Sequence, residues 1–211
     1  MKKYILLSLI VIFLTGGFFV VKLFSQVSFD DVKAFQKSIK LEEETKFREA
    51  IETLLPHYKT NQADYLFNLR LGWLYYNIEK YDSSIICYEA ARKINPSAID
   101  AVYGIRYPVA AKNDKDKLVA LYEEILKADP NDYEANLRLG QIYIEKDLNK
   151  AKSYLLNVYK KFPSYYEPNL SLGYTYYYLG DYANAKILLR NALMLSSSGD
   201  ETLETTLKSI R

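Results

Sequence analysis

Residues Asn68–Tyr75 read NLRLGWLY, and the same pattern returns twice further along the chain. Asn136–Tyr143 reads NLRLGQIY and Asn169–Tyr176 reads NLSLGYTY, so all three segments follow N-L-x-L-G-x-x-Y. A motif that returns in this way is the sequence signature of a chain built from stacked structural repeats. We therefore interpret the sequence around these segments as copies of one unit.

Two independent markers give the length of this unit. Gly72 and Gly140 lie 68 residues apart, which is twice 34, and Gly173 follows after another 33. A series of prolines has the same spacing, 34 and then 33 residues: Pro96, Pro130 and Pro163. Glycine and proline mark different features of a helical protein, so their agreement on one period argues against coincidence.

These residues resemble the tetratricopeptide repeat (TPR), a helix–turn–helix unit of 34 residues. In that family the first helix favours Trp, Leu, Gly and Tyr at positions 4, 7, 8 and 11. The second helix favours Ala at 20 and 27, an aromatic residue at 24 and Pro at 32. The unit at 65–98 carries this pattern on Asn68, Leu71, Gly72, Tyr75, Ser84, Tyr88, Ala91 and Pro96. The unit at 166–199 carries it on Asn169, Leu172, Gly173, Tyr176, Ala185, Leu189 and Ala192, with Ser197 in place of the proline.

The physical roles of these residue types agree with the resemblance. Small residues at positions 8, 20 and 27 let two helices approach closely, while Leu and Tyr fill the layer between neighbouring units. Each proline ends one helix, and the polar residue after it caps the next. A single helix pair cannot bury its apolar face alone, so stability accumulates by stacking.

The resemblance implies an all-α fold, a right-handed α-solenoid of about five TPR helix pairs with a short C-terminal capping helix. The expected solenoid covers 31–200 in five units, followed by the capping helix: 31–64, 65–98, 99–132, 133–165, 166–199 and then 201–211.

Two of these units are degenerate. Unit 31–64 is visible mainly as an amphipathic helix pair, and its second helix contains Pro56. Unit 99–132 places Pro108 inside its first helix and has bulky residues at the three small positions: Arg106, Leu118 and Ile125. Bulky groups and a lost backbone donor predict a splayed or kinked pair, and a break in curvature there.

The chain begins with an apolar leader, expected over residues 1–25. Tyr4–Val21 is uncharged and follows Lys2 and Lys3. As a helix this stretch reaches about 27 Å, near the lower limit for spanning a bilayer. The lysines favour a cytoplasmic N-terminus, so residues 4–21 would form a hydrophobic membrane anchor with the solenoid on the extracytoplasmic side. The alternative is a signal peptide, cleaved after Gly17 or Ser25, which would leave a secreted or periplasmic protein.

Composition argues against a nucleic-acid partner. The chain has 28 Lys+Arg and 26 Asp+Glu, and the leader holds three of the basic residues, which leaves 25 against 26 and a net charge of −1. A nucleic-acid-binding domain is usually strongly basic. The 21 tyrosines suit half-buried surfaces, because each combines an apolar ring with a polar hydroxyl.

Residues with catalytic potential are few. The chain has no nucleophile elbow, phosphate loop, dinucleotide glycine pattern or zinc spacing. Asp114–Lys117 lacks the glycine and terminal Glu of a calcium loop. The single histidine, His57, is expected in a core or half-buried position, and the single cysteine, Cys87, in inert packing. We therefore predict no enzyme activity, no cofactor and no metal.

In the TPR family, positions 2, 5, 9, 12 and 13 of each first helix line a concave binding face. On this register the candidate partner-binding residues are Leu66, Leu69, Trp73, Tyr76, Asn77, Tyr103, Tyr107, Leu137, Gln141, Leu170, Tyr174, Tyr177 and Tyr178. Trp and Tyr dominate this set, and such residues bury large area at low entropic cost. The alternative is that single tyrosines pack against neighbouring repeats. The Lys and Asn that hold a C-terminal carboxylate in some chaperone-binding members are missing.

The function that follows is a protein–protein interaction scaffold at the cell envelope, which binds a peptide or protein segment in an aromatic groove. One alternative is a structural component that assembles with its own copies. A weaker one is a carbohydrate-binding module, because few Asp, Asn or Arg residues accompany the rings to bind sugar hydroxyls. The identity of the partner and the oligomeric state stay open.

Overall fold

The computed structural model describes residues 27–210, and throughout this range the regular structure is α-helical. Eleven helices follow one another along this part of the chain, mostly joined by short turns. They are α1 (Phe29–Glu43), α2 (Phe47–Tyr58), α3 (Tyr65–Asn77), α4 (Tyr81–Ile94), α5 (Asp100–Ala111), α6 (Lys115–Ala128), α7 (Tyr133–Tyr143), α8 (Leu148–Lys161), α9 (Tyr166–Tyr178), α10 (Tyr182–Leu195) and α11 (Glu201–Ser209).

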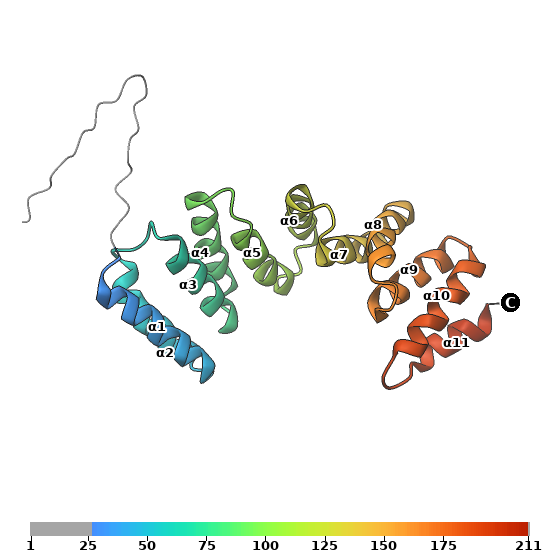
Figure 1. Cartoon of the computed structure of the whole chain (residues 1–211), viewed down its shortest axis with the longest axis horizontal. Helices are drawn as coiled ribbons and strands as arrows, with labels where there is room; N and C mark the ends of the chain where they lie inside the picture. The colour runs from blue at the N-terminus through green and yellow to red at the C-terminus, as the bar shows by residue number, and fades with distance from the viewer. Residues whose placement is uncertain (1–26, 211) are drawn as a thin grey trace, which may run out of the picture.

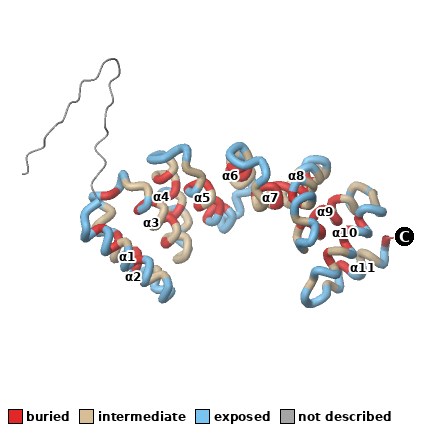
Figure 2. The backbone as a smooth tube through the Cα atoms, in the orientation of Figure 1, coloured by how far each residue is buried: buried red, intermediate tan, exposed pale blue. Residues whose placement is uncertain are grey.

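The helices form a row in which each packs against the next (Figure 1). The molecule is elongated and arched, with α1 and α2 at one end and α10 and α11 at the other. Buried segments lie where neighbouring helices meet, while the connecting turns are largely exposed (Figure 2). The expectation of an all-α, TPR-like solenoid is therefore confirmed. The hydrophobic N-terminal helix predicted from residues 4–21 lies outside the described residues.

Aspartate side chains begin most of the helices. Those of Asp64, Asp132 and Asp181 each accept a hydrogen bond from the backbone N–H three residues later, at 2.9, 2.7 and 3.2 Å. At the start of α1, Ser28 and Asp31 form a reciprocal capping box. The first N–H groups of a helix have no partner within it, so these side chains supply one and fix where each helix starts.

The motif glycines lie where the two helices of a unit approach each other closely. A Cβ atom on Gly72 would lie 2.8 Å from the Tyr88 ring, and one on Gly140 would lie 2.4 Å from Leu155 Cγ. In the last repeat, a Cβ on Gly173 would lie 2.7 Å from Leu189 Cδ2. In each case the residue at position 8 faces the residue at position 24 of the same unit, which explains why only glycine fits.

The motif asparagines hold the loop that enters each repeat. The Asn68 side chain is fully buried, and its Nδ2 donates to the backbone oxygens of Gln62 and Asp64 at 2.8 and 2.7 Å. Asn136 repeats this arrangement with Pro130 and Asp132, and Asn169 repeats it with Pro163 and Tyr165. Asparagine therefore takes a structural role at position 4, where the TPR family favours Trp.

The first helix of the irregular unit is continuous despite its internal proline. Helix α5 continues through Pro108 to Ala111. The first helices α3 and α5 lie close together, as do α7 and α9, whereas close backbone contacts between α5 and α7 are few or absent. Arg106 of α5 has a buried side chain, and its ion pair with Glu134 of α7 links the two helices. A break in curvature at this step stays a prediction.

The first unit is a helix pair despite Pro56, which lies inside α2. Its inner residues Ala50 and Leu54 pack with Leu71 of the second unit in one core cluster. At the other end, Leu203 of α11 is fully buried against α10. Among the described helices, none is long and apolar enough to cross a membrane.

Candidate functional site

The predicted partner-binding residues lie on four first helices, α3, α5, α7 and α9. The structure gathers most of the aromatic ones into two groups, separated by the unit that contains α7. The first group combines residues of α3, α4 and α5. The second combines residues of α9 and α10.

The N-terminal aromatic cluster consists of Trp73, Tyr76, Tyr81 and Tyr107. Trp73 and Tyr76 lie one helical turn apart on α3, with ring centroids 5.8 Å apart. The Tyr107 ring of α5 lies 6.1 Å from the Trp73 ring and 5.5 Å from that of Tyr76. Tyr81, at the start of α4, completes the cluster 6.1 Å from Tyr76. Side chains of two neighbouring repeats thus form one aromatic surface, on which Tyr107 is 39% exposed.

Two ion pairs hold this cluster in place. Arg70 pairs with Glu42 of α1, and the same carboxylate accepts the indole N–H of Trp73. The Trp73 indole is thus already hydrogen-bonded. Its ring is half-buried and packs against the core. Because Glu42 engages both residues, the first repeat helps to orient the aromatic surface of the second.

The second ion pair joins Arg106 and Glu134 beside the cluster. The Arg106 guanidinium lies 4.7 Å from the Tyr107 ring and 5.1 Å from the Tyr103 ring, so it stacks on both. The Tyr103 hydroxyl donates to Asp132 at 2.6 Å. Burial, followed by this hydrogen bond to Asp132, raises the pKa of Tyr103 to about 12. The Tyr103 hydroxyl is thus neutral and occupied at physiological pH.

The C-terminal aromatic cluster consists of Tyr174, Tyr177, Tyr178 and Tyr182. Tyr178 lies 6.2 Å from Tyr174 and 5.6 Å from Tyr177, and Tyr177 lies 5.7 Å from Tyr182, all between ring centroids. Tyr178 and Tyr182 are 57% and 51% exposed. These two rings are more exposed than any ring of the N-terminal cluster, whereas Tyr174 and Tyr177 are partly buried against the core of the last repeat.

The two clusters use the same repeat positions. Positions 9, 12 and 17 carry Trp73, Tyr76 and Tyr81 in the unit 65–98. They carry Tyr174, Tyr177 and Tyr182 in the unit 166–199. Sequence reasoning missed Tyr81 and Tyr182 because they begin the second helix, outside the family's usual binding positions. The recurrence of Tyr at position 17 was the signal that would have found them.

The unit between the clusters carries Gln141 at position 9, where the other two units carry Trp73 and Tyr174, and it corrects one prediction. Leu137 is fully buried in the core with Leu155 and Leu172, so it is not available to a partner, because side chains of its own repeat and of the next one surround it. Gln141 donates to Ser171 Oγ at 3.1 Å and accepts from Arg138 at 2.9 Å.

The remaining predicted residues are divided between surface and core. Leu66 is exposed at the start of α3, whereas Leu69 and Leu170 are partly buried against core clusters. Asn77 is half-buried and donates to the backbone oxygen of Trp73 at 2.9 Å. The exposed Leu66 and the two clusters therefore make up most of the open surface among the predicted residues.

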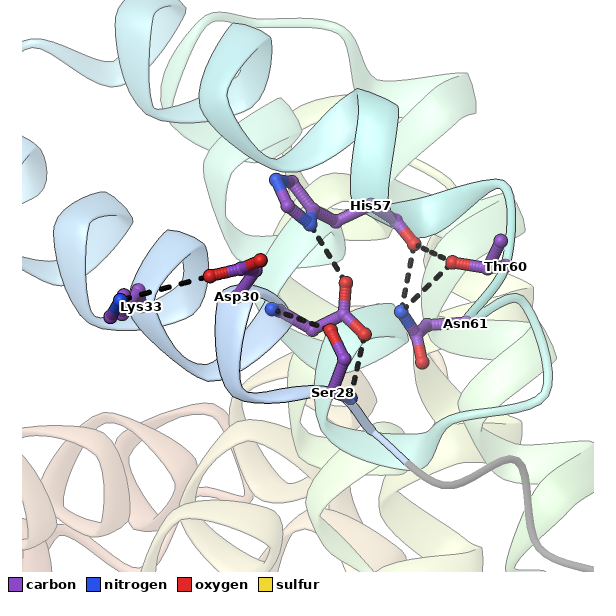
Figure 3. Close-up of polar contacts among 7 residues, drawn as sticks. Ser28, Asp30, Lys33, His57, Thr60 and Asn61 are labelled. Carbon is purple, nitrogen blue, oxygen red and sulfur yellow. Dashed lines mark hydrogen bonds and ion pairs between the residues drawn. The ribbon is translucent and has the colours of Figure 1, made fainter. Parts of the chain in front are cut away.

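The groups with catalytic potential lie in structural positions. His57 is half-buried, and its Nδ1 lies 2.7 Å from Asp31 Oδ1, beside the helix start that Ser28 caps (Figure 3). The hydrogen bond to His57, with those from Ser28, holds the pKa of Asp31 well below its usual range. Cys87 is buried, as predicted, and burial raises its thiol pKa to about 11. Within residues 27–210, no three His, Cys, Asp or Glu side chains gather as a metal site requires.

Comparison with known proteins supports the repeat interpretation. Residues 66–97 and 166–198 match one tetratricopeptide-repeat profile, and residues 134–165 match a second. No curated protein matches the chain.

Several solved structures share the fold. The structure of YrrB, "a TPR protein with an unusual peptide-binding site", superposes with a TM-score of 0.69 at 18% identity, covering 85% of this chain and 92% of that one. MamA from Desulfovibrio magneticus gives 0.69 at 16% identity, covering 87% and 99%. PilW, a "widely conserved type IV pilus biogenesis factor", gives 0.61 at 17% identity, covering 80% and 78%. At these identities the likeness is one of fold, and with the profile matches it shows that the chain contains tetratricopeptide repeats in a TPR-like helical solenoid.

Proposed function

We propose that this chain is a non-catalytic scaffold that binds a peptide or protein segment across its two aromatic clusters. The observation that carries the proposal is the recurrence of three clustered rings at positions 9, 12 and 17 in two repeats, with tyrosines left open to solvent. A folded soluble domain gains little from such rings at its surface. A binding surface gains much, because Tyr and Trp supply large contact area with few rotatable bonds.

The charges around the rings indicate an apolar or aromatic ligand. Beside the N-terminal cluster, Arg70 is paired with Glu42 and Arg106 with Glu134. These pairs leave ring faces and tyrosine hydroxyls as the groups that a ligand would meet. An extended segment or an amphipathic helix with apolar side chains at two separated points fits this arrangement, and Gln141 between the two clusters suits a polar group in the middle of the segment.

The structural neighbours add a general argument. TPR proteins bind protein or peptide partners, and the YrrB structure is described by its peptide-binding site. With identity as low as 18%, this likeness supports the class of function and leaves the ligand to be found by experiment.

We also propose that the solenoid lies at the cell envelope. The uncharged stretch at residues 4–21 and the lysines on either side of it support an anchor with the solenoid on the extracytoplasmic side. Fractionation of cells that express the chain with an N-terminal and a C-terminal tag tests this. Both tags in the membrane fraction support the anchor, whereas loss of the N-terminal tag from a soluble C-terminal fragment shows cleavage.

The binding proposal is tested with variants that spare the fold. Cross-linking in membranes with the full chain identifies the partner, and its dissociation constant is then measured with purified protein. Tyr107→Ser combined with Tyr178→Ser removes one open ring from each cluster. Trp73 is unsuitable because it is half-buried and bonded to Glu42. Loss of about 2 kcal/mol of binding free energy would weaken affinity roughly thirtyfold.

A matched control uses apolar side chains that are also exposed but lie on second helices, Ile86→Ser combined with Ile187→Ser. Both double variants should keep the helix content and melting temperature of the original chain. If the tyrosine variant binds as tightly as the control, the clusters are not the binding surface.

A further inference from the structure

The outward face of α1 carries an apolar row that no other helix covers in the described part of the chain. Phe29 is 74% exposed, and Val32 and Ile39 are also exposed. Their spacing of three and seven residues places them on one side of the helix. The opposite side, with Ala34 and Ser38, is buried against the solenoid. A contiguous apolar row on the surface of a helix is a candidate contact site for a protein or a membrane.

A row of lysines runs beside the apolar row. Lys33, Lys37 and Lys40 are all exposed, and Lys33 lies 4.7 Å over the Phe29 ring. Lys33 also lies 3.7 Å from Asp30, whereas Lys37 and Lys40 form no ion pair within residues 27–210. Glu43 is the other acid on this side, so the three lysines leave a net positive charge.

The position of α1 in the chain indicates what would cover this face. Helix α1 begins at Phe29, seven residues after Lys22, which closes the uncharged stretch that ends at Val21. If that stretch spans a membrane, α1 starts within a few residues of the lipid headgroups. A helix with aromatic and aliphatic residues on one side and lysines beside them is suited to the interface of an anionic bilayer.

We infer that α1 lies flat on the membrane surface, with Phe29, Val32 and Ile39 between the lipids and its lysines on anionic headgroups. The inference rests on the proposed membrane anchor, and it adds a second contact that orients the solenoid. Side chains of such helices enter about 5–10 Å into the boundary between headgroups and acyl chains. Lysine stems extend along the apolar surface and bring the ammonium groups to the lipid phosphates. The aromatic clusters would then have a fixed orientation relative to the membrane.

The experiment measures the environment of α1 in the full chain. The protein, carrying Cys87→Ala, is reconstituted in vesicles of phosphatidylcholine with about 30% phosphatidylglycerol. A nitroxide label is attached at Gln36→Cys, an exposed position on the outward face of α1, or at Glu52→Cys on α2 as a reference. Electron paramagnetic resonance then compares collisions with oxygen, which enters lipid, and with a water-soluble nickel chelate.

We expect the oxygen-to-nickel collision ratio at position 36 to exceed that at position 52 by roughly threefold or more, since oxygen concentrates in the bilayer. Replacing the apolar row by Phe29→Ser, Val32→Ser and Ile39→Ser should remove the difference. A matched triple on other helices should leave it unchanged: Ile86→Ser, Ile187→Ser and Met194→Ser. Vesicles without phosphatidylglycerol should give a smaller ratio, because the lysines lose their anionic partners.

Other outcomes overturn the inference. Equal ratios at the two labels, in protein that floats with the vesicles, mean that the anchor holds while α1 stays in water. A label at position 36 that is shielded from both reagents, increasingly so with protein density, shows that a second copy covers the face. Failure of the full chain to float with the vesicles removes both the anchor and the membrane contact. Partner binding by the aromatic clusters is measured separately and does not depend on any of these results.

Discussion

The motif asparagines offer a sharp test of how the repeats are held together. All three donate two hydrogen bonds to the loop before their helix, but their side-chain oxygens differ. Asn68 Oδ1 accepts from the Tyr58 hydroxyl at 2.8 Å. Asn169 Oδ1 is buried and has no partner within the described residues. The same substitution at these two positions should therefore have unequal effects.

The expected losses of unfolding free energy follow from the number of hydrogen bonds that each side chain makes. Asn68→Ala removes three hydrogen bonds, each worth about 1 kcal/mol, so it should destabilise the protein by about 3 kcal/mol. Asn169→Ala removes two such bonds but also eliminates an unpaired buried acceptor, whose desolvation costs about 1–3 kcal/mol. Its net effect should be about 1 kcal/mol or less. The predicted difference between the two variants is about 2 kcal/mol.

Urea unfolding of the full chain in detergent, followed by far-ultraviolet circular dichroism, measures these effects. With a slope of about 2 kcal/mol per molar urea, Asn68→Ala should lower the midpoint by about 1.5 M and Asn169→Ala by about 0.5 M or less. Asn77→Ala is the control, because this half-buried side chain makes one hydrogen bond, to the backbone oxygen of Trp73. Because repeat arrays can unfold in parts, hydrogen exchange of α3 and α9 should show the same order. Equal losses at the two positions would refute the reasoning.

Three further predictions follow from the packing and the buried groups. Because the pKa of Asp31 is lowered from 3.8, its contribution to stability is present above about pH 4 and is lost as the pH falls below it. His57→Gln should flatten the fall in melting temperature between pH 5 and 3, measured by circular dichroism at about 0.5-unit steps. Gly140→Ala places a methyl group 2.4 Å from Leu155 Cγ and should cost about 1–2 kcal/mol in urea unfolding. The double variant with Leu155→Ala should cost less than the sum of the two single changes. Cys87 should react with a thiol reagent at about pH 8 only when urea unfolds the protein, because burial raises its pKa to about 11.

The positions of the repeats could be read from the sequence because their marks are local. Gly72, Gly140 and Gly173 each face the residue at position 24 of their own unit. This contact forms within a single helix–turn–helix pair, so it does not depend on the other units. In these three units the glycine and the side chain that it faces belong to the same helix pair. The periodic pattern therefore predicts helices, their pairing and the stacking of the pairs.

The members of the two aromatic clusters were predicted only in part. The register included Trp73, Tyr107 and Tyr178, but it also included Leu137, which is completely buried among side chains of its own repeat and the next. It omitted Tyr81, which joins the N-terminal cluster from the start of α4. Exposure at a given position depends on the size of side chains in the next repeat, and that information is not local to the unit.

Sequence alone determined the period, the helical class and the residues at which helices meet, because steric exclusion by a single Cβ acts between neighbours in one unit. Tertiary structure decided how the binding candidates are presented. It brought Glu42 of α1 to Trp73 of α3, and it placed Arg106 between two tyrosine rings at the irregular step. The first contact joins residues of different units, and the second lies on the helix of the irregular unit. Both depend on the angle at which the repeats stack. That angle results from all the packed side chains together, and no single motif encodes it.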